Sequence, residues 1–253
     1  MKYIRFNKDG AVHHGILEKD EVHILRGGLF DRQIRRGSRL NLKDVKLLAP
    51  VIPSKIIAVG LNYTDHAEEL NLTPPIEPLI FLKPSSSVIG PYETIYYPLQ
   101  AKRVDYEAEM AIVIKKKAYN VSYKEAERYI FGYTCLNDVT ARDLQKKDGQ
   151  WTRAKSFNTF CPIGPYVETG IDVSSLKIES FVNKHVKQSS NTSKMIFNCR
   201  ELVEFISGIM TLEPGDVIAT GTPAGVGPIK VGDEVEVRIE KLGSLINKVG
   251  SAK

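Results

Sequence analysis

The sequence has few cysteines and no long hydrophobic run. Its three cysteines, Cys135, Cys161 and Cys199, are widely spaced and include no Cys-x-x-Cys pair, which argues against a disulfide framework and a thiolate zinc site. We expect three buried, reduced thiols. No apolar stretch approaches the roughly 20 residues of a membrane span, and the first residues lack the apolar centre of a secretion signal. We therefore expect a cytoplasmic protein that does not contact membranes.

A strong excess of charge of one sign is also missing. The 35 Lys and Arg residues against 30 Asp and Glu give a formal net charge of +5. The basic residues are dispersed or form short clusters, such as residues 115–117, without interleaved aromatic residues. Such clusters are typical of a solvated face rather than a nucleic-acid surface, so we expect no nucleic-acid partner. The mild positive balance would suit a small anionic substrate.

The chain of 253 residues is long enough for one large domain with a small appendage. Residues 1–52 contain short alternating runs separated by turn residues, which predicts a small β-rich module that ends in a proline-containing linker. Residues 53–253 form the second, larger unit. Predicted strands dominate it, and its predicted helices do not alternate with the strands. This pattern indicates the α+β class, mostly β, with an antiparallel or mixed sheet.

Two helices are marked by terminal signals in the larger unit. Ser122 and Glu125 match a capping box and Gly132 matches a C-terminal cap, so the spacing predicts a helix over residues 122–131. A second helix is predicted over residues 140–148, because an acidic first turn is followed by basic residues and a glycine.

The segment "VDYEAEMAIVI", residues 104–114, alternates like a strand but carries three acids. Asp105, Glu107 and Glu109 are two residues apart, so they share one strand face. On an edge strand this face could simply be solvated. The same face continues into aliphatic residues, however, and burying unpaired acids costs several kcal/mol each. A divalent cation would offset that cost, and oxygen ligands suit Mg²⁺, Mn²⁺ or Ca²⁺ rather than zinc.

Four further residues are candidates for chemistry. Asp138 follows a predicted apolar strand and could supply a third metal ligand, or it could cap the next helix. His66 and Glu69 are three residues apart in a helical pattern and lie on one face, where the carboxylate could orient the imidazole, or both could be solvated. Lys155 lies among apolar and aromatic residues, where it either extends to solvent or binds an anion.

The glycine-rich segment "ATGTPAGVGPI", residues 219–229, is similar at first sight to a phosphate loop. It lacks the Gly-Lys-Ser/Thr ending, so nucleotide binding is only weakly indicated. Its backbone N–H groups and Thr222 could instead bind a carboxylate.

These motifs together resemble the fumarylacetoacetate hydrolase family. The matching segments, in order over residues 53 to 250, are "VGLNYTDHAEEL", "PLIFLKPSSSVIGP", "VDYEAEMAIVI", "LNDVTARDLQ", "RAKSFNTFCPIGP", "NTSKMIF" and "LEPGDVIATGTPAGVG". The N-terminal module is similar to the one that precedes this domain in many bacterial members. The resemblance implies a mostly β domain with a mixed, rolled sheet that forms a homodimer.

The resemblance also implies a metal site. Its ligands would be Glu107, Glu109 and Asp138, and its metal Mg²⁺ or Mn²⁺, with Ca²⁺ able to replace it in crystals. Asp105 has no comparable ligand role and is expected to be a supporting neighbour.

The remaining roles implied by the resemblance concern catalysis and substrate binding. His66 and Glu69 would orient or activate a water molecule, and Lys155 would help to hold negative charge. Gln145 and Thr222 would bind the substrate.

The activity implied is that of a divalent-metal-dependent enzyme acting on small anionic 2-oxo acids through a metal-bound enolate. We favour C–C hydrolysis of an acylpyruvate-like substrate of the fumarylpyruvate or fumarylacetoacetate type. Isomerisation of the 2-hydroxyhepta-2,4-diene-1,7-dioate type and decarboxylation of oxaloacetate use the same chemistry, and fold similarity does not choose among them. A non-catalytic metal-binding or ligand-binding module is the alternative of a different class.

Overall fold

The computed structural model of the protein describes residues 1–31 and 35–252. Strands make up 46% of it and helices 17%, which confirms the predicted α+β class with mostly β structure. The α-helices of the described residues are short: α1 (Thr64–Glu69), α2 (Arg142–Asp148), α3 (Thr152–Lys155) and α4 (Cys199–Ile209). Short 3-10 turns are η1 (Leu42–Asp44), η2 (Ser85–Ser87), η3 (Ala126–Tyr129) and η4 (Thr192–Lys194).

Most strands belong to one twelve-stranded sheet. Its main path runs through β4 (Arg35–Asn41), β3 (Glu21–Arg26), β2 (Ala11–Glu18), β1 (Lys2–Lys8), β14 (Cys161–Glu168), β12 (Ile130–Asn137), β11 (Ala108–Ile114), β17 (Val217–Ala219), β6 (Lys55–Gly60) and β7 (Leu79–Pro84). Two further strands, β5 (Lys46–Leu48) and β8 (Val88–Ile89), pair with β1 and β14. The β17–β6 and β14–β8 pairs are parallel and the others antiparallel, so the sheet is mixed, as predicted.

Two smaller sheets complete the larger unit. The five-stranded sheet has the order β16 (His185–Asn191), β15 (Lys177–Val182), β19 (Glu234–Ile239), β20 (Gly243–Ser251) and β9 (Thr94–Tyr97). The three-stranded sheet has the order β13 (Thr140–Ala141), β10 (Val104–Tyr106) and β18 (Gly227–Ile229). Strand β10 therefore belongs to a different sheet from β11, although only one residue separates them.

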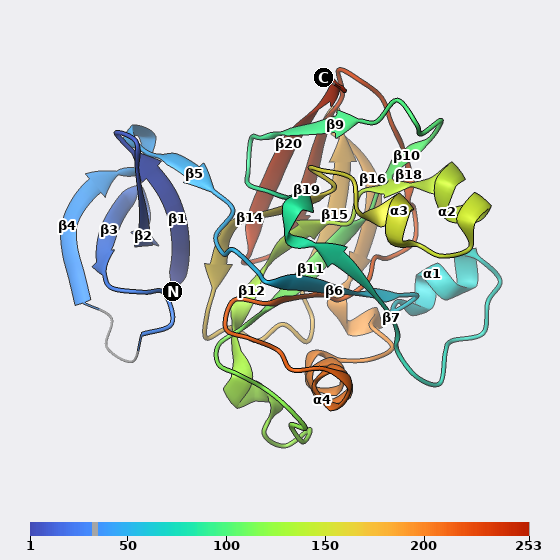
Figure 1. The fold of residues 1–253 in the computed structure, drawn as a ribbon, viewed down its shortest axis with the longest axis horizontal. Helices are drawn as coiled ribbons and strands as arrows, with labels where there is room; N and C mark the ends of the chain where they lie inside the picture. The colour runs from blue at the N-terminus through green and yellow to red at the C-terminus, as the bar shows by residue number, and fades with distance from the viewer. Residues whose placement is uncertain (32–34, 253) are drawn as a thin grey trace.

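The N-terminal strands β1 to β5 form a lobe beside the larger unit (Figure 1). This lobe has its own small core, which includes Ile4, Phe6 and Val22. It joins the large sheet where β1 pairs with β14 over two residue pairs. The boundary at residue 52 stays a prediction.

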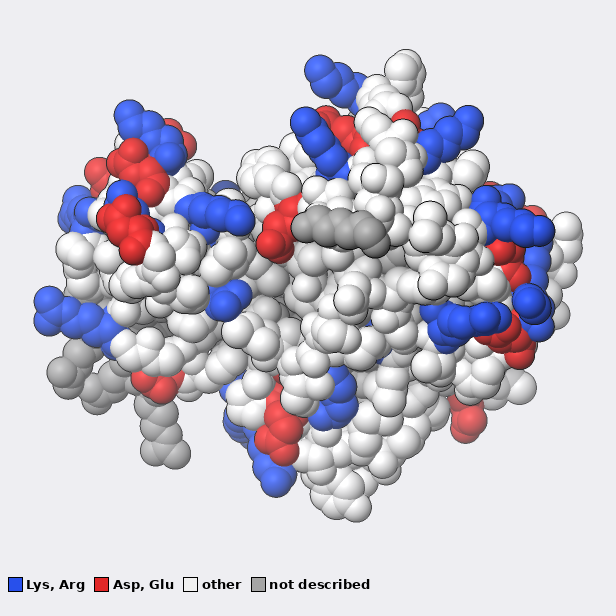
Figure 2. All heavy atoms as spheres, turned by 45° about the horizontal axis from the view of Figure 1, so that its top comes forward, with Lys and Arg blue, Asp and Glu red and all other residues white. Residues whose placement is uncertain are grey.

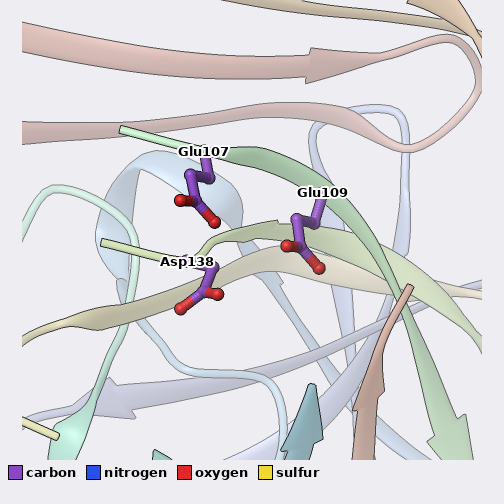
Figure 3. A group of neighbouring side chains, drawn as sticks. All are labelled: Glu107, Glu109 and Asp138. Atoms are coloured by element: carbon purple, nitrogen blue, oxygen red, sulfur yellow. The ribbon is translucent and has the colours of Figure 1, made fainter. Parts of the chain in front are cut away.

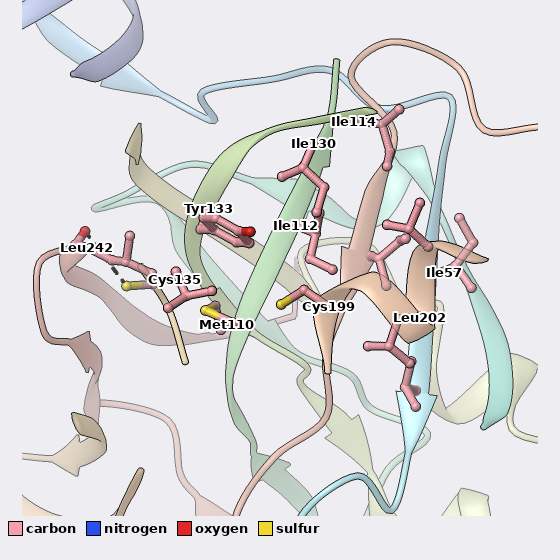
Figure 4. Packing of buried hydrophobic residues seen from close by; sticks show 14 of the residues in the cluster. Ile57, Met110, Ile112, Ile114, Ile130, Tyr133, Cys135, Cys199, Leu202 and Leu242 are labelled. Carbon is pink, nitrogen blue, oxygen red and sulfur yellow. Dashed lines mark hydrogen bonds between the residues drawn. The ribbon is translucent and has the colours of Figure 1, made fainter. Parts of the chain in front are cut away.

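The main core lies between the large sheet, the five-stranded sheet and α4 (Figure 4). Strand β11 is central in this arrangement, because it pairs with β12 on one side and β17 on the other. Its residues Met110 and Ile112 pack into the main core, whereas Ala111 and Val113 pack into a second cluster on the opposite face. Both faces of β11 are thus buried, and a solvated acidic face is excluded. The three cysteines are free and buried, as predicted.

The helix predicted over residues 122–131 is wrong. The segment forms the 3-10 turn η3 and then enters β12 at Ile130, and the hydroxyl of Ser122 bonds to the Glu125 side chain at 3.3 Å instead of capping a helix. Gly132 lies inside β12, where an added Cβ would come within 2.3 Å of the Glu168 carbonyl oxygen. The glycine therefore permits close approach of two strands rather than ending a helix.

Charged side chains of both signs are interspersed on the face shown in Figure 2, which has no continuous basic stripe. The helices of the described residues are also too short and too polar to span a bilayer. The absence of a nucleic-acid partner stays a prediction.

Candidate metal centre

The acidic strand predicted over residues 104–114 is broken at Glu107, between β10 and β11. The break is held by the side chain of Asn137, whose oxygen accepts the Glu107 N–H at 3.0 Å. Next to it, the Asp138 N–H donates to the Glu107 carbonyl at 2.9 Å. The end of β12 is thereby fixed beside the start of β11, and Asp138 is brought to the two glutamates.

Glu107, Glu109 and Asp138 form a buried carboxylate triad (Figure 3). One oxygen from each lies within 4.8 Å of the others, and the residues are 6%, 1% and 1% exposed. Asp105 is not part of this group, because its carboxylate accepts hydrogen bonds from Arg103 and Arg142. Arg142 also pairs with Glu107, so Asp105 supports the triad through this arginine, consistent with its expected role as a neighbour.

Two buried lysines share the carboxylate of Asp138. Lys155 Nζ donates to Asp138 Oδ2 at 2.5 Å and to Glu107 Oε2 at 2.9 Å. Lys83 Nζ donates to Asp138 Oδ1 at 2.5 Å. Lys155 is thus held beside anions rather than extended to solvent. Its ammonium also lies 5.0 Å from the centre of the Phe81 ring, a favourable cation–π distance.

The three acids differ in how their charge is compensated. Burial favours the neutral form of Glu107, but Lys155 and Arg142 outweigh it and lower its pKa to about 2. Burial, together with the neighbouring Asp138 and Glu107 carboxylates, raises the pKa of Glu109 well above its ordinary value. Among the described residues Glu109 accepts one hydrogen bond, from the Gly221 N–H at 2.8 Å.

The triad fits a hard divalent cation. Its donors are all carboxylate oxygens, and they converge closely enough to share one ion. Glu109 is the decisive member, since it is buried next to two like charges with a single neutral donor. A cation at this point would remove the repulsion at Glu109, which Lys155 offsets only in part.

The triad lines a cavity of about 400 Å³. The same cavity is lined by His66, Gln145, Lys155 and Thr222, four of the residues singled out in the sequence. Its apolar lining comes from Val59, Leu61, Leu70, Leu72, Leu79, Phe81 and Trp151. The predicted site residues are therefore brought together, and they face a space large enough for a small organic acid.

Glu69 is the one predicted site residue that does not line the cavity. Its Oε2 contacts His66 Nδ1 at 2.9 Å, and its Oε1 accepts the Gly225 N–H at 3.0 Å. Glu69 thus orients the His66 imidazole without itself lining the cavity. The chain enters α1 through Asn62, whose amide donates to the carbonyls of Thr220 at 2.7 Å and Phe197 at 3.0 Å.

The loop that follows β17 binds carboxylates, but they belong to the protein itself. The N–H groups of Gly221 and Gly225 are taken by Glu109 and Glu69, and that of Ala224 lies 3.5 Å from an oxygen of Asp65. Gly221 has φ +92°, and an added Cβ would come within 2.7 Å of Asn62. The loop therefore holds the site together rather than offering these N–H groups to a ligand.

Three functional candidates were not found in the sequence. Lys83 is buried on β7 two residues after Phe81, which places both on one strand face, and this alternation was the signal available for it. Arg142 and Gln188 carry no comparable signal, because their importance depends on partners far away in the sequence: Arg142 reaches β10 and Glu107, and Gln188 contacts Thr222.

Residues 55–250 match the family described as "Fumarylacetoacetate (FAA) hydrolase C-terminal". The chain belongs to the fumarylacetoacetate hydrolase family. Residues 1–50 match a second family, described as "Rv2993c-like, N-terminal". The predicted resemblance is confirmed, and with it the membership of a family whose relatives are enzymes.

Three relatives illustrate the range of reactions in the family. The chain is 47% identical to "Oxaloacetate tautomerase Fahd2a, mitochondrial" of Rattus norvegicus, over 81% of this chain and 70% of the relative. It is 42% identical to the structure of 5-carboxymethyl-2-hydroxymuconate delta-isomerase from Mycobacterium smegmatis, with a TM-score of 0.94 and full coverage of both chains. It is 29% identical to maleylpyruvate hydrolase from Sphingobium sp. SYK-6, solved with manganese(II) and pyruvate, with a TM-score of 0.82 and full coverage of both chains.

Proposed function

We propose that the protein is a divalent-metal-dependent enzyme that converts 2-oxo acids by way of an enolate. The observation that carries this proposal is the position of the carboxylate triad in a cavity that also contains His66, Lys155 and Thr222. A cation site alone would need only the triad. The added base, ammonium and hydroxyl are the groups that proton transfer and stabilisation of an oxyanion require.

We propose Mg²⁺ or Mn²⁺ as the metal, held by Glu107, Glu109 and Asp138. The ion would supply Lewis-acid polarisation of the 2-oxo-carboxylate. The complex of the Sphingobium relative with manganese(II) and pyruvate supports this choice.

The side chains of this protein would have complementary roles. His66, oriented by Glu69, would accept or deliver the proton of the reaction. Lys155 is buried and positively charged: burial alone would lower its pKa, but the Asp138 and Glu107 carboxylates outweigh this effect and leave the pKa above the ordinary value. It would therefore stabilise negative charge rather than act as a base. Gln145 and Thr222 would bind oxygens of the substrate.

We propose C–C hydrolysis of an acylpyruvate-like substrate as the reaction. In it, His66 would take a proton from water as the oxygen adds to the distal carbonyl, and the bond between that carbon and the pyruvate methylene would break. The products would be a carboxylic acid and the enolate of pyruvate, which is then protonated. The cavity supports a substrate of this length, since about 400 Å³ with a largely apolar wall exceeds the needs of a four-carbon acid.

Tautomerisation or isomerisation of a 2-oxo acid is the second candidate. It is favoured by the names of the rat and Mycobacterium smegmatis relatives, which are 47% and 42% identical to this chain. It requires the same base and the same enolate, but no attacking water.

One panel of assays separates these reactions. The purified protein with Mg²⁺ is incubated with fumarylpyruvate, oxaloacetate and 2-hydroxyhepta-2,4-diene-1,7-dioate, and cleavage, decarboxylation and keto–enol conversion are followed by absorbance and by pyruvate formation. We expect cleavage of fumarylpyruvate into fumarate and pyruvate. Keto–enol conversion without cleavage would instead support the second candidate.

A simpler measurement tests the enolate itself. NMR in D₂O follows exchange of the methyl protons of pyruvate, which we expect to depend on both Mg²⁺ and His66. Metal binding without exchange, and without turnover of any substrate in the panel, would contradict an enzymatic role and favour a binding module.

A further inference from the structure

Gln188 is a buried side chain that joins two parts of the site without lining the cavity. It lies on β16, is 1% exposed, and uses both ends of its amide. Its Oε1 accepts the Ala108 N–H at 2.9 Å, between the two glutamates of the triad. Its Nε2 donates to Thr222 Oγ1 and to the Pro223 carbonyl, both at 2.8 Å. One side chain thus connects β11 with the loop after β17.

The orientation of this amide is fixed by backbone groups. The Ala108 N–H can only donate, so it must face the amide oxygen, and the Pro223 carbonyl can only accept, so it must face the NH₂ group. The NH₂ group is therefore also the part that faces Thr222. Since an amide NH₂ only donates, Thr222 Oγ1 must act as the acceptor in this bond.

A hydroxyl that accepts from Gln188 must direct its own hydrogen elsewhere. Within the described residues, no hydrogen bond is donated by Thr222 Oγ1, although the residue is only 6% exposed and lines the cavity. The N–H groups of Gly221 and Gly225 in the same loop are already bound to protein carboxylates. The Thr222 hydroxyl is thus a side-chain donor that this loop retains for a ligand.

We propose that Gln188 is a positioning residue that holds the Thr222 hydroxyl as a hydrogen-bond donor to a carboxylate or enolate oxygen of the bound 2-oxo acid. The inference rests on the proposed function, because it takes the ligand to be an anionic oxo acid. Gln188 touches neither the ligand nor the triad side chains, and it acts through Thr222. A neutral hydroxyl whose hydrogen is kept free of protein acceptors is suited to an anionic ligand, since it needs no proton rearrangement when the ligand binds.

The test uses Mn²⁺ alone and oxalate as probes. Oxalate is a stable dianion with the shape of the enolate of pyruvate, and calorimetry measures its binding to the Mn²⁺-loaded protein. Five variants are compared: Thr222→Val, Thr222→Ser, Gln188→Met, the double variant Gln188→Met with Thr222→Val, and Ser189→Ala as the matched control. Ser189 is the exposed neighbour of Gln188 on β16.

We expect Thr222→Val and Gln188→Met each to weaken oxalate binding roughly 10-fold, the loss typical of a hydrogen bond to a charged group. The double variant should lose no more than either single variant, because both substitutions remove the same interaction. Thr222→Ser should retain the affinity, Ser189→Ala should be unchanged, and Mn²⁺ binding should be the same throughout.

Gln188→Met leaves two buried backbone groups without partners, so Gln188→Glu provides a second route. It keeps an acceptor for Ala108 but presents an acceptor to Thr222, whose hydroxyl would then turn away from the cavity. We expect a similar loss of oxalate affinity with Mn²⁺ binding retained. Additive losses of oxalate affinity in the double variant, or normal oxalate binding by the Gln188 variants, would overturn the role of Gln188 and leave the proposed function standing. Absence of Mn²⁺-dependent oxalate binding by the unaltered protein would overturn the proposed function as well.

Discussion

Two buried carboxylates of this protein are treated in opposite ways. Asp216, immediately before β17, is fully buried and accepts hydrogen bonds from the backbone and side chains of Ser54 and Lys55 and from the Glu213 N–H. Burial alone would raise its pKa, but these bonds lower it. Glu109 is equally buried, has one donor, and has a raised pKa.

The difference in hydrogen bonding distinguishes a carboxylate that stabilises the fold from one that belongs to the candidate metal site. Donors from three residues surround Asp216, so its charge is already balanced and it ties β17 to β6. Glu109 faces two other carboxylates and forms no ion pair with any of the residues that the structure describes. A buried acid with a complete set of hydrogen-bond donors stabilises the fold. A buried acid among like charges instead indicates a binding site for a cation.

The largest effect is expected from Glu109→Gln. The substitution removes a metal ligand without changing the size of the side chain, so Mn²⁺ affinity should fall by more than about 100-fold, beyond the range for residues that only orient a ligand. Activity should be lost with it. The metal-free variant should be at least as stable as the unaltered protein, because a like charge has been removed. Titration calorimetry measures the Mn²⁺ affinity and urea unfolding the stability. A clear loss of stability would contradict the distinction between Glu109 and Asp216.

Asp216→Asn should have the opposite profile. Loss of the charge leaves the Lys55 ammonium without its partner and should lower the free energy of unfolding by about 3 kcal/mol, while Mn²⁺ affinity is unchanged. The loss should also depend on pH. Because the pKa of Asp216 is lower in the folded state, its contribution is present above the ordinary pKa of 3.8 and disappears as the pH falls below that value. Urea unfolding between pH 3 and 7 should show the two proteins converging in acid, and a constant difference would contradict this account.

Lys83→Met tests whether a lysine beside the triad partly replaces the charge of a metal ion. The substitution leaves one oxygen of Asp138 unpaired beside the other two acids and should destabilise the metal-free protein by about 2 kcal/mol. Mn²⁺ should restore part of this loss, since the ion supplies positive charge at the same place. Thermal unfolding with and without Mn²⁺ should therefore show a larger shift in Tm than in the unaltered protein. The exposed Lys115→Met is the control, and equal shifts in both variants would argue against this role of Lys83.

Asp65 is intermediate between Asp216 and Glu109, and its substitution should have the smallest effect on activity. Its carboxylate accepts from Ser190 Oγ at 2.5 Å and from Lys194 at 3.3 Å, which holds the short helix α1 against β16 and η4. A six-residue helix is marginal without such contacts. Asp65→Asn should therefore reduce turnover roughly 5-fold, about 1 kcal/mol in the barrier, and speed amide exchange across α1.

The control for Asp65 lies on the same helix. Glu68 is exposed, and Glu68→Gln should change neither turnover nor exchange. Mn²⁺ binding should be normal in both variants. If Asp65→Asn weakened Mn²⁺ binding instead, the carboxylate would act on the triad and not on the helix.

Much of the fold and most of the candidate residues could be predicted from the sequence. Motifs with local spacing, such as His66 with Glu69, place their side chains on one face by geometry alone, and the structure brings His66 to the same cavity as the triad with Glu69 in contact with its ring. The break at Glu107 could not be predicted, because alternation continues through the point where the chain leaves one sheet for another. The helix over residues 122–131 failed because tertiary contacts outweigh the local capping signals: the Tyr123 N–H donates to the Glu204 side chain of α4, and Ala126 packs into the main core. The catalytic roles, the homodimer and the cellular compartment stay predictions.

The contact between Asn62 and Thr220 joins residues that are 158 positions apart in the sequence. Strands β6 and β17 are parallel neighbours beside this contact, so the entry to α1 and the loop with Thr222 meet only when both ends of the larger unit have paired. Contacts of such long range are formed at a high cost in loop entropy and slow the folding of a domain. We therefore expect the cavity to be assembled late, so that Mn²⁺ affinity appears during refolding only when folding is complete.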